Sequence, residues 1–128
     1  MTTYPTATGA IDFGILAKSG AAARSFKKGD VIFKLGDPAS ELYVVQSGTV
    51  AIEIGGRRLE TVEANNIFGE MALIDHAPRS ADAVAASDAT IVPVGEKQFL
   101  FMVSNTPFFA LQVMRVLARR LRAVDSTL

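Results

Sequence analysis

The feature that most constrains the fold of this chain is a succession of short β-rich runs separated by glycine-containing turns. Between about residues 25 and 62, runs rich in valine, isoleucine and aromatic residues alternate with pairs such as Gly29-Asp30 and Ser47-Gly48. Gly55-Gly56 is the strongest turn signal, because two glycines adopt the positive φ angles of a tight hairpin without steric strain. We therefore predict that strands over 49–54 and 57–62 pair, in an antiparallel sandwich or barrel.

Similar β-rich runs continue beyond the hairpin, and helical patterns occupy both ends of the chain. An irregular segment, residues 65–81, interrupts the strands with glycine and proline. On a barrel, such an excursion carries function more often than a plain connection does. The predicted strands are 31–33, 42–45, 49–54, 57–62, 82–86 and 90–94, and the predicted helices are 11–18, 96–103 and a last one that starts at Thr106-Pro107.

The last predicted helix carries an apolar stripe. Pro107 suits its first position, since proline has a preset φ and no amide hydrogen to leave unpaired. The stripe fits either packing against the chain's own barrel or a seam between two copies of the chain. Arg115, Arg119 and Arg122 lie on other faces, and we interpret them as a solvated surface. The stripe consists of Ala110, Met114, Leu117, Leu121, Val124 and Leu128, at alternating spacings of four and three.

Composition excludes several classes of function. The 128 residues fit one domain, and 13 basic residues balance 13 acidic ones, so no net charge attracts nucleic acid. The chain has no cysteine and a single histidine, His76, which argues against thiol chemistry and against a metal site. We find no apolar stretch of membrane-spanning length and no pattern of catalytic residues. We expect a cytoplasmic, non-catalytic protein without membrane insertion, metal or cofactor.

Residues 68–81, which we call the cassette, carry the most informative chemistry. Gly69 opens a short helical run over 70–74, so the amides of residues 69–72 are expected to be unpaired and to attract an anion. Arg79 is the only cation in this segment, and an arginine beside free amides binds a phosphate well. Glu70 is explained if it accepts a sugar hydroxyl. The pair therefore indicates either a ribose phosphate ligand or a direct Glu70–Arg79 ion pair.

The cassette resembles that of cyclic nucleotide-binding domains. The resemblance rests on Phe-Gly-Glu-Met-Ala-Leu over 68–73 and Pro-Arg-Ser-Ala over 78–81, and it extends over about residues 11–125. It implies an α+β fold: an eight-stranded antiparallel jelly-roll β-barrel with a short cassette helix, an N-terminal helix and two C-terminal helices. It also implies a cyclic nucleotide-binding domain over 11–128, and the Thr-, Gly- and Ala-rich residues 1–10 are expected to form a flexible N-terminus.

The resemblance assigns roles to individual residues. Glu70 is expected to accept the ribose 2′-hydroxyl, and Arg79 to bind the exocyclic oxygens of the cyclic phosphate. Ser80 is expected to contact the phosphate or the base, and it favours cyclic AMP over cyclic GMP. Val124 and Asp125 are expected to form a lid over the base. The remaining expected contacts come from Phe68, Gly69, Met71, Ala72 and Ala81, of which all but Phe68 are expected to offer backbone groups.

The implied function is that of a sensor. Binding of the nucleotide is expected to close the C-terminal helix over the barrel and to pass a signal to a partner, which is an effector protein or domain. A homodimer through the last helix is a second possible assembly. The alternative function is a protein-interaction or scaffold module whose pocket no longer binds nucleotide.

Overall fold

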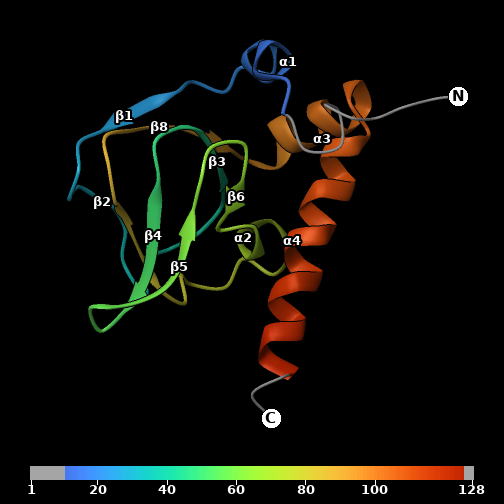
Figure 1. Cartoon of the computed structure of the whole chain (residues 1–128). Coiled ribbons are helices and arrows are strands. Elements are labelled where there is room, and N and C mark those ends of the chain that lie inside the picture. The colour runs from blue at the N-terminus through green and yellow to red at the C-terminus, as the bar shows by residue number, and fades with distance from the viewer. Residues whose placement is uncertain (1–10, 126–128) are drawn as a thin grey trace, which may run out of the picture.

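The fold is α+β, with two antiparallel sheets and a set of helices on one side of them (Figure 1). The structure is a computed structural model that describes residues 11–125, with side chains through residue 123. Residues 1–10, predicted to be a flexible N-terminus, lie outside the described residues. The elements are α1 (Phe13–Lys18), β1 (Arg24–Phe26), β2 (Val31–Phe33), β3 (Leu42–Ser47), β4 (Val50–Ile54), β5 (Arg57–Val62), β6 (Ile67–Phe68), α2 (Met71–Ile74), β7 (Asp82–Ala85), β8 (Ala89–Val94), α3 (Glu96–Asn105) and α4 (Phe108–Asp125).

The strands form two four-stranded sheets. One has the order β1-β8-β3-β6 and the other the order β2-β7-β4-β5. Among residues 11–125, no strand pairing joins one sheet to the other. The expected number of strands and their antiparallel pairing are confirmed, whereas closure into a jelly-roll barrel stays a prediction.

The hairpin at Gly55-Gly56 is confirmed. Both glycines have positive φ, 58° and 79°, and β4 pairs with β5 from Ile54↔Arg57 to Val50↔Val62. The register shifts between Ile52 and Glu53, which places a local irregularity in this ribbon. Two short strands that the sequence pattern did not delimit, β1 and β6, pair at the edges of the first sheet. Of these, β6 leads directly into the cassette.

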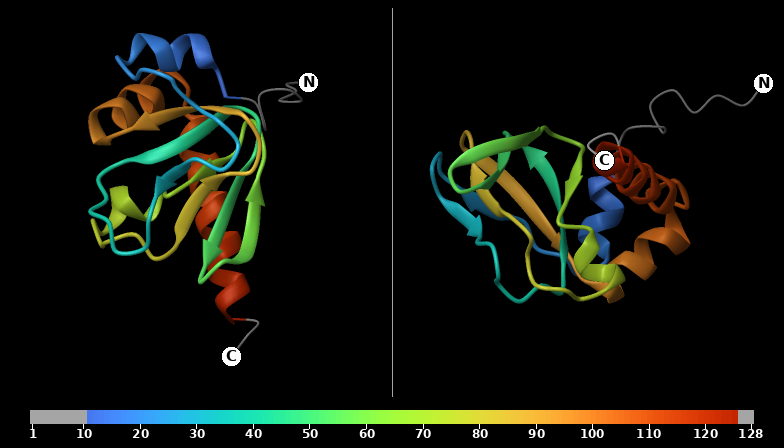
Figure 2. Two further views of the ribbon diagram at one scale, coloured as in Figure 1. Left: turned by 90° about the vertical axis from the view of Figure 1, so that its left-hand side faces the viewer. Right: turned by 90° about the horizontal axis from the view of Figure 1, so that it is seen from below.

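The core is divided between two clusters, and β3 contributes to both. Leu42 and Val44 pack with the helices, while Tyr43 and Val45 point between the two sheets. Alternation of side chains along a strand produces this division, and burial on both faces explains why β3 begins as a continuous apolar run. Two views of the ribbon show α1, α3 and α4 gathered on one side of the sheets (Figure 2).

The packing face of α4 differs from the predicted one. The residues of α4 that are buried against the sheets and α3 are Phe109, Val113 and Val116. Met114 and Leu121 of the predicted stripe are 56% and 65% exposed. Helix α4 has two neighbouring apolar stripes, and periodicity could not tell which one meets the core. Leu117 of the same predicted stripe is partly buried against the core, so the interpretation that this stripe packs against the chain's own barrel holds for Leu117 and is wrong for Met114 and Leu121.

The other helices begin and end close to their predicted limits. Asp12 caps α1 by accepting a hydrogen bond from the Ile15 amide, and Gly20 follows with a φ of 93°.

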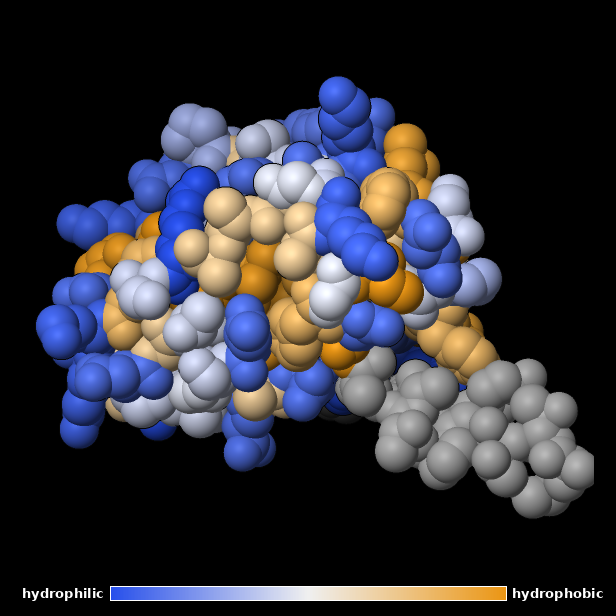
Figure 3. Space-filling model, turned by 90° about the horizontal axis from the view of Figure 1, so that it is seen from above, coloured by the Kyte–Doolittle hydropathy of each residue, from blue (hydrophilic) through white to orange (hydrophobic). Residues whose placement is uncertain are grey.

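On the face seen from above, apolar side chains show in the middle and hydrophilic ones gather around them (Figure 3). Among the described residues, no helix taken alone is long and apolar enough to cross a membrane, although α3 and α4, bent by 120°, pass that test together.

Candidate functional site

The cassette begins where β6 ends and turns sharply at Gly69. The φ of Gly69 is 71°, and a Cβ atom there would lie 2.7 Å from Nη1 of Arg79. Glycine is required at this position for both reasons, since other residues adopt positive φ only with strain. The turn places α2 against the sheets and brings residues 69–72 opposite residues 79–81 around one cavity.

Glu70 is fully buried and pairs with α4. Its Oε2 atom lies 2.8 Å from Nη1 of Arg120, whose Nη2 atom lies 3.3 Å from Oε1 of Glu60 on β5. Burial raises the pKa of the Glu70 carboxyl above its ordinary value, even though Arg120 acts to lower it. One arginine of α4 therefore connects the cassette and the second sheet.

Arg79 is buried as well, but it is paired only with neutral groups. Its Nη1 donates to the carbonyl oxygen of Gly69 at 3.1 Å, and its Nη2 donates to the carbonyl oxygen of Glu41 at 2.8 Å. Its backbone is fixed to the β2–β3 loop, because its amide donates to Asp37 and its carbonyl accepts from Gly36. Glu70 and Arg79 do not pair with each other, so the direct ion pair that the sequence left open is wrong.

The remaining cassette residues fall into two groups. Phe68, Ala72 and Ala81 are buried, whereas Met71 and Ser80 are exposed. The expectation of unpaired amides over residues 69–72 is wrong for Ala72, whose amide donates to the carbonyl oxygen of Gly69 at 3.3 Å. The reason is that α2 starts with a tight turn, which pairs an amide earlier than an α-helical turn does.

The side chains of some predicted residues lie outside the described part of the chain, and others occupy the turn after α2, where Asp75 also lines the cavity. Helix α4 extends through Val124 and Asp125, but their side chains, predicted to cover a base, lie outside the described residues. His76 is exposed, with a φ of 55°, so it occupies a turn of the segment that follows α2. Asp75 accepts a hydrogen bond from the Ala77 amide, as expected of a turn aspartate.

Arg120 is the site residue that sequence reasoning missed. The arginines of the last helix were interpreted as a solvated face, and Arg115, Arg119 and Arg122 are indeed exposed. Arg120 differs because it lies next to the buried stripe of Phe109, Val113 and Val116 and follows Val116 by four residues. Four residues separate neighbours on one helix face, so its position relative to that stripe was the available signal.

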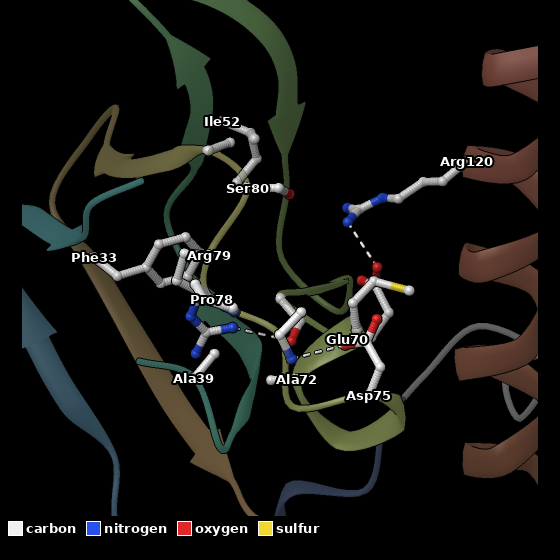
Figure 4. A pocket seen from close by; sticks show the side chains of 14 residues that line it. Phe33, Ala39, Ile52, Glu70, Ala72, Asp75, Pro78, Arg79, Ser80 and Arg120 are labelled. Atoms are coloured by element: carbon white, nitrogen blue, oxygen red, sulfur yellow. Dashed lines mark hydrogen bonds and ion pairs between the residues drawn. The ribbon is translucent and has the colours of Figure 1, made fainter. Parts of the chain in front are cut away.

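These residues enclose a cavity of about 190 Å³ between the cassette, the sheets and α4. Figure 4 shows Phe33 and Arg79 on one side and Arg120 reaching from α4 on the other, with Glu70 between them. Within the described residues, three buried side-chain polar atoms lack a hydrogen-bond partner: Oε1 of Glu70, Nε of Arg79 and Nε of Arg120. All three belong to residues that line this cavity.

Unpaired buried polar atoms are rare in folded proteins, and their concentration at one place calls for an explanation. Here they amount to one hydrogen-bond acceptor and two donors on charged groups. A small molecule with hydroxyl groups and an anion can satisfy such a set.

Comparison with known proteins agrees with this geometry. The model of the cyclic nucleotide-binding domain matches residues 23–106, which include both halves of the cassette. The chain belongs to the cyclic nucleotide-binding domain family. The resemblance noted from the sequence is thereby confirmed, and the two sheets and the helices described above are this chain's version of that domain.

Relatives with this domain include proteins of different kinds. The cyclic AMP receptor protein of Thermus thermophilus is 36% identical over 115 residues, which are 86% of this chain and 53% of that protein. Glutaminase 1 of Bradyrhizobium diazoefficiens is 38% identical over 109 residues, 83% of this chain and 18% of that protein. The crystal structure of the Thermus thermophilus catabolite activator protein has a TM-score of 0.75 and 32% identity, over 90% of this chain and 55% of that one. The chain thus spans about half the length of the Thermus thermophilus receptor protein and less than a fifth of the length of the glutaminase.

Proposed function

We propose that this chain is a non-catalytic regulatory sensor that binds a cyclic nucleotide in the cavity between the cassette and α4. The observation that carries this proposal is the set of three unpaired polar atoms of Glu70, Arg79 and Arg120 around one cavity. A cyclic nucleotide offers a ribose hydroxyl and a singly charged phosphate on one rigid ring system. The hydroxyl matches the unpaired acceptor of Glu70 and the phosphate matches the cation of Arg79, two groups that the fold holds apart.

The assignment of each group follows from its partners. Oε1 of Glu70 accepts the 2′-hydroxyl, because Oε2 is already paired with Arg120. Arg79 binds the exocyclic oxygens of the phosphate, and a charge-assisted bond of this kind contributes ~1.5 to 3 kcal/mol. Ser80, exposed at the cavity, donates to the phosphate or the base, while Gly69, Met71, Ala72 and Ala81 contribute backbone contacts beside the buried Phe68.

Cyclic AMP is the favoured ligand over cyclic GMP. Ser80 is the residue type that accompanies cyclic AMP more often in this family, and the Thermus thermophilus relative is named for cyclic AMP.

The response to nucleotide binding passes through Arg120, which links α4 to Glu70, the residue that accepts the sugar hydroxyl. The ligand stabilises the arrangement in which α3 and α4 lie against the sheets, and an effector protein or domain detects that arrangement.

The exposed stripe of α4 supports a second copy of the chain as a partner. Met114 and Leu121 lie seven residues apart, and the stripe keeps the four-three spacing of a helix seam. Phe109, Val113 and Val116 are buried in the chain's own core, and Leu117 of the stripe is partly buried against it. Met114 and Leu121 of the stripe stay exposed. We propose that two copies pair through this stripe.

Isothermal titration with cyclic AMP tests the site. We expect Arg79→Ala to weaken binding about tenfold or more, equal to at least ~1.4 kcal/mol. Glu70→Ala should weaken it somewhat less, because it removes one hydrogen bond rather than the charge that binds the phosphate. The exposed Lys97→Ala, on α3, is the control and should bind as the wild type does. Unchanged affinity in both cassette variants would contradict the assignment.

A thermal-shift comparison of cyclic AMP, cyclic GMP and 5′-AMP tests the ligand class. A ligand that binds only the folded chain raises its melting temperature, and the rise grows with the logarithm of the ratio of ligand concentration to dissociation constant. We expect the largest shift with cyclic AMP and the smallest with 5′-AMP, whose phosphate carries more charge and no ring. No shift with any of the three at millimolar concentration would favour the scaffold function instead.

A further inference from the structure

Three aromatic rings meet behind the cavity and join the two sheets. Phe33 comes from β2, Tyr43 from β3 and Phe68 from β6. Their ring centroids are 5.8 Å apart for Phe33 and Tyr43, 5.9 Å for Phe33 and Phe68, and 5.2 Å for Tyr43 and Phe68. Such distances are typical of interacting aromatic pairs, so the three side chains form a mutually supported group.

The guanidinium of Arg79 lies on this aromatic group. Its central carbon is 4.2 Å from the centroid of Phe33 and 5.3 Å from that of Tyr43. Both distances fall within the range of cation–π attraction. Two carbonyl oxygens hold the Nη atoms, as described above, and within the described residues Arg79 forms no salt bridge with a carboxylate.

This environment fixes the position of a cation without neutralising it. A carboxylate partner would hold the arginine equally well, but an incoming phosphate would then have to compete with it. Aromatic faces and carbonyl oxygens attract the guanidinium through partial charges alone, so its full positive charge stays available. A planar guanidinium also stacks in a defined orientation, which an ammonium group cannot do.

We propose that Phe33 and Tyr43 are positioning residues for the phosphate, because they orient Arg79 and keep it unpaired with any acid. This inference rests on the proposed function and adds to it a reason for the affinity of the phosphate contact. Under this inference, separate groups of residues recognise the sugar and the phosphate. The sugar is recognised through Glu70 and Arg120, and the phosphate through Arg79 on its aromatic support.

The test uses the two phosphorothioate analogues of cyclic AMP, Sp and Rp, in which sulfur replaces one or the other exocyclic oxygen. A precisely oriented arginine distinguishes the two oxygens, so the ratio of the two dissociation constants reports its orientation. We expect Phe33→Leu to weaken binding of cyclic AMP about tenfold and to bring the Sp-to-Rp ratio close to one. Phe33→Tyr, which keeps the ring, should retain the ratio of the wild type.

Two controls separate positioning from loss of packing. Phe26→Leu removes a ring of β1 that packs against the same cluster, and it should leave the ratio unchanged. Phe33→Met serves as a second ringless variant if Phe33→Leu unfolds, as judged from melting temperatures without nucleotide. In a double-mutant cycle, Phe33→Leu should add little to Arg79→Lys, because lysine cannot stack on the ring.

The outcomes distinguish this inference from the function on which it rests. If the wild type binds cyclic AMP but Phe33→Leu keeps the Sp-to-Rp ratio, or the effects in the cycle simply add, the positioning role is overturned and the function stands. If the wild type binds neither cyclic AMP nor its analogues, the function fails and the positioning role fails with it.

Discussion

Glu70 is an ionisable side chain that the fold buries completely, with only one of its two carboxylate oxygens paired. An unpaired buried acceptor destabilises the folded state unless something compensates. Arg120 supplies part of the compensation and a ligand hydroxyl supplies the rest in the proposed complex. At the scale of single residues, the site is thus arranged so that a ligand completes it.

This burial predicts a pH dependence. The pKa of Glu70 in the folded chain is raised above its ordinary value of 4.5, chiefly by burial. Because the folded state then binds this proton more tightly than the unfolded chain, the contribution of Glu70 to the free energy of unfolding falls as the pH rises from 4.5 through the folded pKa. We expect Glu70→Gln, which cannot titrate, to lack that fall.

Urea unfolding without nucleotide, at several pH values from 4.5 upward, measures this difference. The wild type should lose stability relative to Glu70→Gln as the pH rises. Glu63→Gln, at an exposed position of the chain, is the matched control. A wild type that instead gained relative stability over this range would show that Arg120 outweighs burial.

At the scale of elements, α4 is connected to the rest of the molecule in two ways. Its buried face packs on the sheets and on α3, where the rings of Phe99 and Phe109 lie 5.8 Å apart. Further along the helix, Arg120 forms ion pairs with Glu60 of β5 and Glu70 of the cassette. The second connection involves the ligand site directly, and it is therefore the one through which binding can change the position of α4.

Loss of Arg120 is predicted to loosen α4. Arg120→Ala leaves Glu70 buried and unpaired. Because the side chain of Arg120 is itself 30% exposed, the decrease in the free energy of unfolding should lie between the values for a surface ion pair and a buried one, ~1 to 3 kcal/mol. Arg119→Ala, next to it on the exposed side of the same helix, should change stability by less than ~0.5 kcal/mol. Urea unfolding and hydrogen exchange of the α4 amides measure both effects. Equal behaviour of the two variants would contradict the role of Arg120.

At the scale of the whole molecule, packing of α4 on the sheets and on α3 leaves Met114 and Leu121 exposed on a neighbouring face of the helix. The proposed dimer would cover Met114 and Leu121 of both copies, in an arrangement in which the same stripe meets itself. We expect the wild type to sediment as a dimer and Met114→Glu with Leu121→Glu to sediment as a monomer.

The melting temperature of the double variant at low protein concentration should stay near that of the wild type, because both positions are exposed. Substitution of the exposed Lys97 and Leu100 of α3 by glutamate tests whether any new charge disrupts the assembly. A wild type that is monomeric at all concentrations would overturn the dimer.

The sequence by itself determined the elements that depend on local chemistry. Gly55-Gly56 fixed the hairpin because the positive φ angles of its turn suit glycine, and the cassette motif identified Glu70 and Arg79 because residue types and spacing carry that resemblance. Periodicity also located α3 and α4, since a repeat of about 3.6 residues is a property of the chain alone.

Only the tertiary structure decided which groups meet. The sequence left open whether Glu70 pairs with Arg79, and the fold instead brings Arg120 to Glu70 from 50 positions further along the chain. It also turned the stripe of Phe109, Val113 and Val116 inward rather than the stripe of Met114 and Leu121. Both outcomes depend on the rotation and position of α4 relative to the sheets. Packing of distant side chains sets these quantities, and no local pattern contains them.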